Sequence, residues 1–170
     1  MAMATINPTT GETEFEVELH TPDEVETRIA LAQTAHETLR TMSYAERAAL
    51  MIKAADLIES EVEQTAIMLT REMGKPIAQS RGEVLKCAKS MRFYAEKAEE
   101  FLAPQVLADP STVNASQAMA IWQPLGVVLA VMPWNYPLWQ VIRFAGPALM
   151  AGNSGVLKHA SNVPQSALYL

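Results

Sequence analysis

The chain has 170 residues, of which 49% are hydrophobic, and carries a formal net charge of −6 at pH 7. This length and composition suit one globular domain with a substantial core, and they give no indication of disorder. The acidic balance, without any cluster of Lys or Arg, argues against nucleic acid or an anionic membrane as a partner.

Cysteine and histidine usage narrows the chemistry further. The single cysteine, Cys87, excludes an internal disulfide and is typical of a reducing compartment. The three histidines share no ligand spacing, so we predict no metal site. Pro133 and Asn135 interrupt the longest apolar run, which leaves it too short to span a membrane. The first residues lack the basic and apolar regions of a signal peptide, and we therefore expect a cytoplasmic protein.

The first hundred residues predict one strand followed by helices. Residues 7–12 have the composition of a turn, and alternation after them indicates a half-buried strand. Thr21 and Ser43 each begin a capping box, which marks a helix start. The second helix pattern is long, and 59–61 could divide it before the stop at 74–76. The expected ranges are 15–20 for the strand, and 21–39, 43–73 and 77–103 for the helices.

The second part of the chain predicts a βαβ unit. Residues 104–116 are loop-like, and 117–123 alternate weakly, as in a strand. The unbroken apolar run 125–132 is typical of a strand with both faces buried, as in a parallel sheet. A helix pattern extends to Ala151, and a second short strand covers 155–158. In such sheets ligands bind outside the carboxyl ends of the strands, where Asn135 and Lys158 stand.

This order of elements predicts an incomplete α/β fold, in which a helical layer precedes the first βαβ of a Rossmann-like parallel sheet. Two parallel strands cannot cover their own edges. We therefore expect the chain to be the N-terminal portion of something longer. Its expected parts are a strand and helical segment (1–116), a segment that contains the weakly alternating strand (117–124) and the truncated βαβ (125–170).

Asn135 is the first candidate for chemistry. A glycine-rich phosphate loop would follow the first strand of a dinucleotide-binding fold, yet residues 133–137 contain no glycine. An amide held between Pro133 and Pro137 could instead stabilise a developing oxyanion. The alternative is that Asn135 caps the following helix.

Lys158, Ser161 and Asn162 form a second candidate group. Lys158 could donate to the hydroxyls or phosphate of a nucleotide, or it could simply extend into water, as most strand-end lysines do. Ser161 and Asn162 could line the same turn or cap the helix that begins at Pro164.

Two further side chains have a structural and a chemical interpretation. Arg143 lies off the apolar face of its helix, where it is either solvated or available to bind an anion. Cys87 lies beside the apolar stripe of the third helix, far from the strand ends, and we expect it to be a buried structural thiol.

The motifs of the chain resemble those of the aldehyde dehydrogenase superfamily in order and spacing over essentially all 170 residues. The proline-tryptophan-asparagine sequence at 133–135 is the most specific of them. Residues 143–147 and 157–160 resemble the succinate-semialdehyde dehydrogenases within that family. The matching segments are Arg71–Pro76, Pro124–Val128, Met132–Pro137, Gly146–Leu149, Ala151–Asn153 and Val156–Lys158.

The resemblance implies NAD(P)+-dependent oxidation of an aldehyde to a carboxylic acid. In that family a cysteine attacks the carbonyl, the thiohemiacetal passes hydride to the nicotinamide, and a glutamate assists hydrolysis of the thioester. Asn135 matches the asparagine that helps to hold the oxyanion. The cofactor-contacting positions correspond to Trp134, Asn135, Lys158, His159, Ala160 and Ser161, with Lys158 reaching the adenosine ribose.

The resemblance also implies a cofactor-binding domain, a catalytic domain and an oligomerisation arm, to which 117–123 would belong. The family's catalytic cysteine and glutamate lie beyond Leu170, and Cys87 does not match the nucleophile. We therefore expect the isolated chain to be inactive and the full-length enzyme to be a homo-oligomer. The alternative is a non-catalytic fragment that acts only by associating with a partner chain.

Substrate and cofactor choice are predicted from two residues. An arginine is common at position 143 in the semialdehyde dehydrogenases, which indicates succinate semialdehyde as the substrate. Ser161, which is small and uncharged, favours NADP+ over NAD+, although NAD+ stays open. The chain departs from the family at His159, where proline is usual and a less rigid turn is expected. A second departure is Gly155, which should weaken the second strand.

Overall fold

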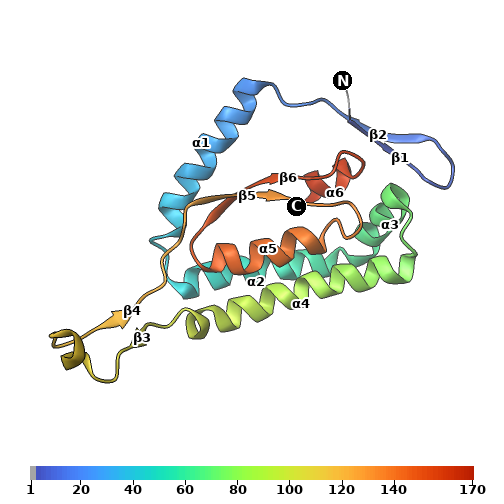
Figure 1. Cartoon of the computed structure of the whole chain (residues 1–170). Coiled ribbons are helices and arrows are strands. Elements are labelled where there is room, and N and C mark those ends of the chain that lie inside the picture. The colour runs from blue at the N-terminus through green and yellow to red at the C-terminus, as the bar shows by residue number, and fades with distance from the viewer. Residues whose placement is uncertain (1–2) are drawn as a thin grey trace.

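The computed structural model describes residues 3–170, in which a layer of helices packs beneath a small parallel sheet and one long helix lies on its other face (Figure 1). All three predicted helical regions are confirmed, and the second is divided as expected. The helices are α1 (Pro22–Leu39), α2 (Tyr44–Ser60), α3 (Val62–Met73) and α4 (Ile77–Phe101).

The helix ends follow from local side chains and backbone. Thr21 and Ser43 both form the predicted capping boxes, each with the glutamate three residues later. Glu61 separates α2 from α3, within the segment where a break was predicted. Gly74 ends α3 with a φ of 76°, a left-handed conformation that favours glycine.

The predicted βαβ unit is confirmed. It consists of β5 (Val127–Val131), α5 (Trp139–Met150) and β6 (Ser154–Lys158). The two strands are parallel, with Val131 opposite Lys158. Their carboxyl ends therefore meet at one edge of the sheet, and the segments that follow them leave side by side.

The two-stranded sheet lies between α1 on one face and α5 on the other, with α2 and α4 packed against α5 (Figure 1). Ser154 Oγ donates to the Ala32 carbonyl at 2.7 Å, and the His36 ring lies 3.1 Å from the Gly152 carbonyl oxygen. These contacts attach the second half of α1 to the start of β6. The core lies below the sheet and includes Leu69, Val84, Cys87, Leu138, Ile142 and Met150.

Gly155 has a packing role that the sequence did not reveal. A Cβ atom added there would lie 3.1 Å from the Phe144 ring and 3.4 Å from the Val128 carbonyl oxygen. The glycine therefore leaves room for an aromatic side chain of α5 against the strand. Its cost in strand propensity is offset by that contact.

An N-terminal hairpin precedes the helices. It pairs β1 (Met3–Ile6) with β2 (Thr13–Val17) in antiparallel fashion, around the turn predicted at 7–12. β1 was not predicted from the sequence, and the strand predicted at 15–20 is wrong at both ends, since β2 begins at Thr13 and ends at Val17. Arg71 of α3 donates to both carboxylate oxygens of Glu14, which attaches the hairpin and lowers the pKa of Glu14 below its usual value.

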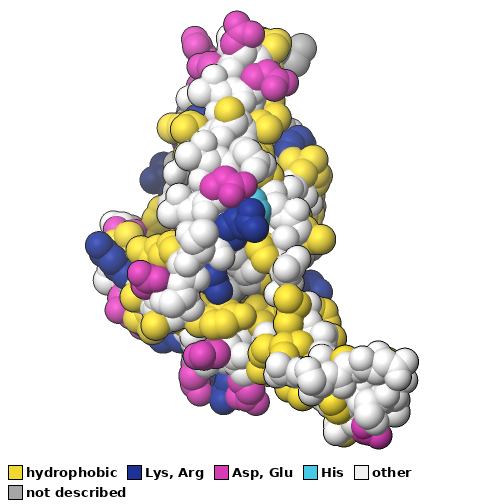
Figure 2. Space-filling model, turned by 90° about the vertical axis from the view of Figure 1, so that its left-hand side faces the viewer, with side chains coloured by type: hydrophobic (Ala, Val, Ile, Leu, Met, Phe, Trp, Pro, Cys, Tyr) yellow, Lys and Arg dark blue, Asp and Glu magenta, His cyan; other side chains and the backbone are white. Residues whose placement is uncertain are grey.

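A second hairpin projects from the body between α4 and β5, with hydrophobic side chains gathered near its base (Figure 2). It pairs β3 (Gln105–Val106) with β4 (Met119–Ala120) around a 3-10 turn at Pro110–Val113. Residues 104–116 are therefore not loop alone. The strand predicted at 117–123 is wrong outside Met119–Ala120, because its single partner strand pairs over the same short length.

The described chain ends with α6 (Pro164–Tyr169), at the helix start predicted at Pro164. Within residues 3–170, none of the helices is long and apolar enough to cross a membrane.

Candidate functional site

Two loops meet at the carboxyl edge of the sheet. The first runs from β5 through Asn135 to α5, and the second runs from Lys158 to α6. The Met132 N–H donates to the Lys158 carbonyl at 3.1 Å, and the His159 ring reaches the Pro137 carbonyl oxygen at 2.8 Å. The structure thus brings together the two segments in which the sequence analysis placed its site residues.

The Asn135 side chain is exposed and makes no hydrogen bond within residues 3–170. Its neighbour Trp134 is 50% exposed at the same edge. The predicted alternative, that Asn135 caps the following helix, is wrong. The residue at the start of α5 is Leu138, and no side chain of this loop caps the helix. The Asn135 amide is therefore available to a bound molecule.

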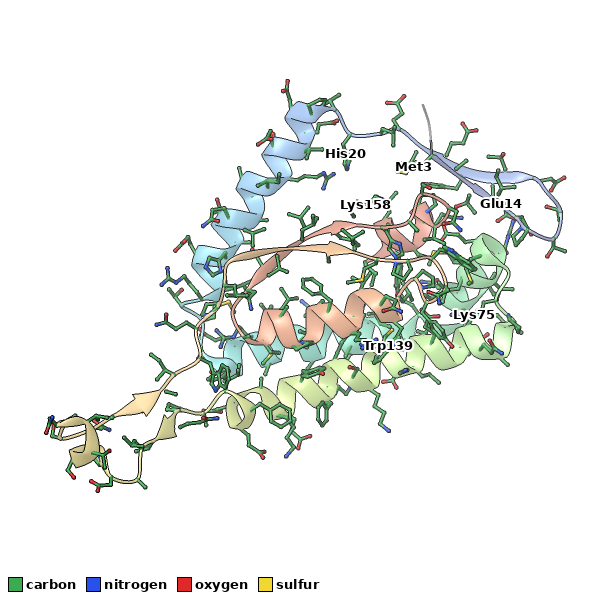
Figure 3. All side chains as sticks on the ribbon, in the orientation of Figure 1. Met3, Glu14, His20, Lys75, Trp139 and Lys158 are labelled. Atoms are coloured by element: carbon green, nitrogen blue, oxygen red, sulfur yellow. The ribbon has the colours of Figure 1, made fainter. Side chains whose placement is uncertain are left out.

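The first turn of α5 is capped from a distance by Glu83 of α4. Its Oε1 atom accepts from the Leu138 and Trp139 N–H groups, each at 3.0 Å. Its other oxygen forms a buried ion pair with Lys75, whose Nζ lies 3.7 Å from the centroid of the Tyr136 ring. Lys75 and Trp139 lie at the same end of the helical layer (Figure 3).

Sequence reasoning missed Glu83, although a signal for it exists. The side chains of Ser80, Glu83 and Cys87 recur at helical spacing, and all three are buried. A carboxylate on the buried stripe of a helix needs hydrogen-bond donors, because an unpaired buried charge is strongly destabilising. Such a residue predicts a partner in a neighbouring element.

The start of α6 is capped in the same way by Glu72 of α3, which is 2% exposed. Its carboxylate accepts from the Gln165 and Ser166 N–H groups at 2.6 and 2.9 Å, and from the Ser166 hydroxyl. The Thr5 hydroxyl of β1 donates to it as well, at 2.7 Å.

The polar side chains of the second loop do not cap α6. Val163 stands at the N-cap of α6, and no side chain of the loop caps the helix. The predicted alternative, in which Ser161 and Asn162 cap this helix, is therefore wrong. Both residues are exposed beside Lys158.

The turn after β6 is held by His159, which is 8% exposed. Its Nδ1 accepts from the Ala160 N–H at 2.8 Å, so its Nε2 carries the proton that is donated to the Pro137 carbonyl. Hydrogen bonds at both ring nitrogens therefore hold the turn at the position where proline is usual in the family. The Lys158 side chain is exposed and has no ion-pair partner within residues 3–170.

Arg143 is exposed on α5 and has no ion-pair partner in the described chain. The helix begins at Trp139, so only about one helical turn separates its start from Arg143 within the eight-residue interval from Asn135. The rest of that separation is irregular loop.

Cys87 is fully buried in α4. Burial, together with repulsion from the Glu83 carboxylate, raises the pKa of its thiol to about 12. This confirms the prediction of a structural thiol, since the thiolate is the reactive form. The described residues contain no group of three or more His, Cys, Asp or Glu side chains placed to hold a metal ion.

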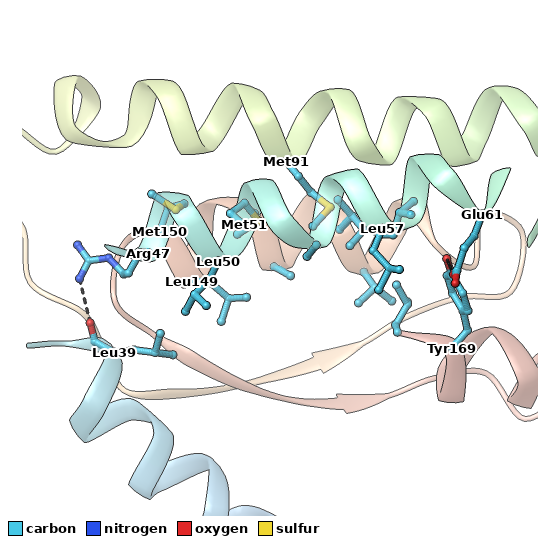
Figure 4. Close-up of a pocket in the computed structure, with 17 residues that line it drawn as sticks. Leu39, Arg47, Leu50, Met51, Leu57, Glu61, Met91, Leu149, Met150 and Tyr169 are labelled. Atoms are coloured by element: carbon cyan, nitrogen blue, oxygen red, sulfur yellow. Dashed lines mark hydrogen bonds between the residues drawn. The ribbon is translucent and has the colours of Figure 1, made fainter. Parts of the chain in front are cut away.

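An apolar cavity of about 490 Å³ lies away from these loops, between α2 and α5 (Figure 4). Met51, Leu57, Val141 and Leu149 are among its lining residues. Arg47 borders it and donates to the Leu39 carbonyl at 2.9 Å. None of the predicted site residues lines this cavity, so the candidate site is the edge formed by the two loops.

Proteins with similar sequences include aldehyde dehydrogenases and succinate-semialdehyde dehydrogenases. The chain is 56% identical over 170 residues to an aldehyde dehydrogenase of Paenarthrobacter nicotinovorans and to succinate-semialdehyde dehydrogenase [NADP(+)] 1 of Mycobacterium tuberculosis. All of this chain, but only 37% of either relative, is covered.

Solved structures with a similar fold also include a dehydrogenase of this kind. A succinic semialdehyde dehydrogenase of Streptococcus pyogenes, in complex with NADP+, matches 99% of this chain with a TM-score of 0.91 and 34% identity. The structure of Gox0499 gives a TM-score of 0.93 and 39% identity over the same share, and the chain covers 36% of each. The model of the aldehyde dehydrogenase family matches residues 1–170, and the chain therefore belongs to that family.

Proposed function

We propose that this chain is the N-terminal, cofactor-binding part of a longer NADP+-dependent dehydrogenase that oxidises succinate semialdehyde to succinate. The observation that carries the proposal is the meeting of the Asn135 loop with the Lys158 turn at the carboxyl edge of a parallel sheet. The relatives named as NADP+-dependent succinate-semialdehyde dehydrogenases, 56% identical over the whole chain, support the substrate and the cofactor.

The residues of the second loop fit a phosphorylated nucleotide. Lys158 is exposed without an ion-pair partner in the described chain, and residues 159–162 contain no carboxylate. A cation without an acidic neighbour suits the negative charge of NADP+. We assign Lys158 and Ser161 to the adenosine ribose and its phosphate, with Trp134, Asn135, His159 and Ala160 completing the cofactor site. When bound, the nicotinamide serves as the hydride acceptor.

We assign the Asn135 amide a role in binding the carbonyl oxygen of the aldehyde. As the cysteine of the longer protein adds to the carbonyl, negative charge develops on the carbonyl oxygen. A preorganised amide N–H directed at that oxygen stabilises the transition state more than the ground state. Glu83 and His159 hold the loop backbone that follows Asn135, which limits movement of the Cα atom from which the amide extends.

The proposal is tested with the purified 170-residue chain and the full-length enzyme. The chain alone should form no NADPH from succinate semialdehyde, since the only cysteine in it is buried Cys87. The full-length enzyme should form NADPH at a measurable rate, followed by absorbance at 340 nm, a wavelength characteristic of the reduced cofactor. Turnover by the chain alone, or none by the full-length enzyme, would contradict the assignment.

Ser161 is expected to read the 2′-phosphate of the cofactor. Replacing Ser161 with glutamate should raise the KM for NADP+ far more than the KM for NAD+, because the carboxylate repels the phosphate yet can accept hydrogen bonds from ribose hydroxyls. The matched control, Ser161→Ala, removes only a small neutral group and should change the ratio of the two KM values less than threefold. Equal effects of the glutamate on both cofactors would show that Ser161 does not contact the phosphate.

Arg143 is expected to select for the substrate carboxylate. A charge-assisted contact contributes about 1.5–3 kcal/mol, or roughly one to two decades in affinity. Arg143→Ala in the full-length enzyme should therefore lower kcat/KM for succinate semialdehyde about tenfold or more, while butanal, which lacks the carboxylate, is nearly unaffected. Arg28→Ala, an exposed arginine of α1, is the control. Equal losses for both aldehydes would make Arg143 structural.

We further propose that the projecting hairpin is the start of an oligomerisation arm in a homo-oligomer. Val106 is 65% exposed, and Ile121 and Trp122 are each 57% exposed. Large apolar side chains in such positions favour burial against another chain. Because β3 pairs with β4, we include Gln105–Val106 in the proposed arm, which was expected from the sequence to begin at residue 117.

A further inference from the structure

We propose that Lys75 and Glu83 are positioning residues for the Asn135 amide. The inference rests on the proposed function, and it concerns how the loop from β5 through Asn135 to α5 is held in place. Both side chains come from the helical layer below the loop and are almost wholly buried, with 5% and 0% of their side-chain surface exposed. A buried ion pair by itself contributes little to stability, because the loss of hydration offsets its attraction. Its role must therefore be found in what it contacts.

The ion pair holds the loop at two points, on either side of Pro137. Glu83 Oε1 accepts from the Leu138 and Trp139 N–H groups after the proline. Lys75 Nζ lies against the Tyr136 ring before it, 3.7 Å from the centroid. Because Lys75 and Glu83 form an ion pair with each other, the contacts on both sides of Pro137 are linked.

A third contact fixes Pro137 itself: His159 Nε2 donates to the Pro137 carbonyl at 2.8 Å. Every residue from Tyr136 to Trp139 is thus fixed by a side chain of another element. Asn135 comes immediately before this fixed segment, and its own side chain makes no hydrogen bond within residues 3–170. Its position is therefore inherited from its neighbours, and a misplacement of about 1 Å can lower a rate about a hundredfold.

Capping of α5 alone does not explain the pair. One oxygen of Glu83 receives both N–H groups, while the other is bonded to Lys75. A glutamine at 83 can keep one oxygen toward both N–H groups, and its NH₂ group then faces the ammonium of Lys75. Glu83→Gln therefore preserves the cap and breaks the link to Lys75, which separates helix capping from loop positioning.

The test uses the full-length enzyme with Lys75→Met and Glu83→Gln. Each variant should lower kcat for succinate semialdehyde about tenfold or more, while the dissociation constant for NADPH, measured by fluorescence titration, changes less than threefold. Lys86→Met is the matched control: this exposed lysine also lies on an aromatic ring, 3.8 Å from the Trp139 centroid, but forms no ion pair with Glu83, whose ion-pair partner is Lys75. Its kcat should stay within threefold of the parent.

Coupling to Asn135 decides whether the effect is one of positioning. In an Asn135→Ala background, Lys75→Met and Glu83→Gln should lower kcat by less than threefold, because the amide they position is gone. If the full loss persists in that background, or if both single variants keep kcat within threefold, the inference is overturned. If one variant does not fold, the other supplies the same comparison. Failure of the proposed function is distinct, since the unmodified full-length enzyme would then show no aldehyde oxidation.

Discussion

Replacing Asn135 with alanine in the full-length enzyme is expected to lower kcat for succinate semialdehyde at least a hundredfold. Loss of one oxyanion donor typically costs about two to three decades in kcat. The structure favours the full effect, because the Asn135 side chain neither caps α5 nor bonds elsewhere in the described chain. The measurement is steady-state NADPH formation at saturating cofactor.

Two companion measurements make the result specific. Asn135→Asp has nearly the same shape but lacks the amide donors, so it should be as damaging as alanine. The dissociation constant for NADPH should change only slightly in both variants. A kcat within threefold of the parent for the alanine variant would remove Asn135 from the catalytic machinery, even if the aspartate variant were inactive.

Replacing Glu72 with alanine is expected to destabilise the purified chain by about 3 kcal/mol or more. The change leaves the Gln165 and Ser166 N–H groups and the Thr5 hydroxyl without their acceptor, and each unpaired buried group costs about 1–3 kcal/mol. For a chain of this size, 1 kcal/mol corresponds to roughly 2–4 °C, so Tm should fall by about 6 °C or more. Thermal unfolding followed by circular dichroism measures it.

The glutamine variant tests the mechanism. Each oxygen of Glu72 faces one backbone N–H, so a glutamine NH₂ group must oppose one of them. Glu72→Gln should therefore also lower Tm, although less than alanine does. The control is Glu63→Ala, which removes an exposed ion pair with Arg81 and should cost less than about 1 kcal/mol. Equal Tm values for the Glu72→Ala and Glu63→Ala variants would show that the carboxylate of Glu72 is not a structural centre.

Local signals explain what the sequence could predict. Capping boxes at Thr21 and Ser43 and the stop at Gly74 depend on neighbouring residues, and all are confirmed. The two parallel strands and the helix between them were visible as apolar patterns, but the prediction that both faces of the first strand are buried is wrong, since Leu129 and Val131 of β5 are 65% and 64% exposed. The strand order followed from chain connectivity, which then placed the Asn135 loop beside the Lys158 turn.

The missing features depend on contacts between distant segments. β1 was overlooked because a strand of four residues has too few positions for alternation to be seen. Glu72 and Glu83 bond to groups that are 93 and 55 residues away in sequence. The helical spacing around Glu83 indicates that it needs a partner, but no local pattern identifies which distant group that partner is. The burial of α1 is also not evident from its sequence, since Val25 and Ile29 are apolar and lie at helical spacing, yet each is 42% exposed.

Because distant glutamates cap α5 and α6, the residues that start these helices are not the loop residues that we assign to cofactor and substrate. In many proteins the polar residue that starts a helix at a strand end must also serve the ligand, and a change there alters both properties. Here Glu83 and Glu72 start the helices, so Trp134 and Ser161, which we assign to the cofactor, can vary with little penalty to the scaffold. Related enzymes that keep these glutamates could therefore diversify in cofactor and substrate by single substitutions in the loops. Directed evolution of this site should begin at those loop positions and leave the helical layer unchanged.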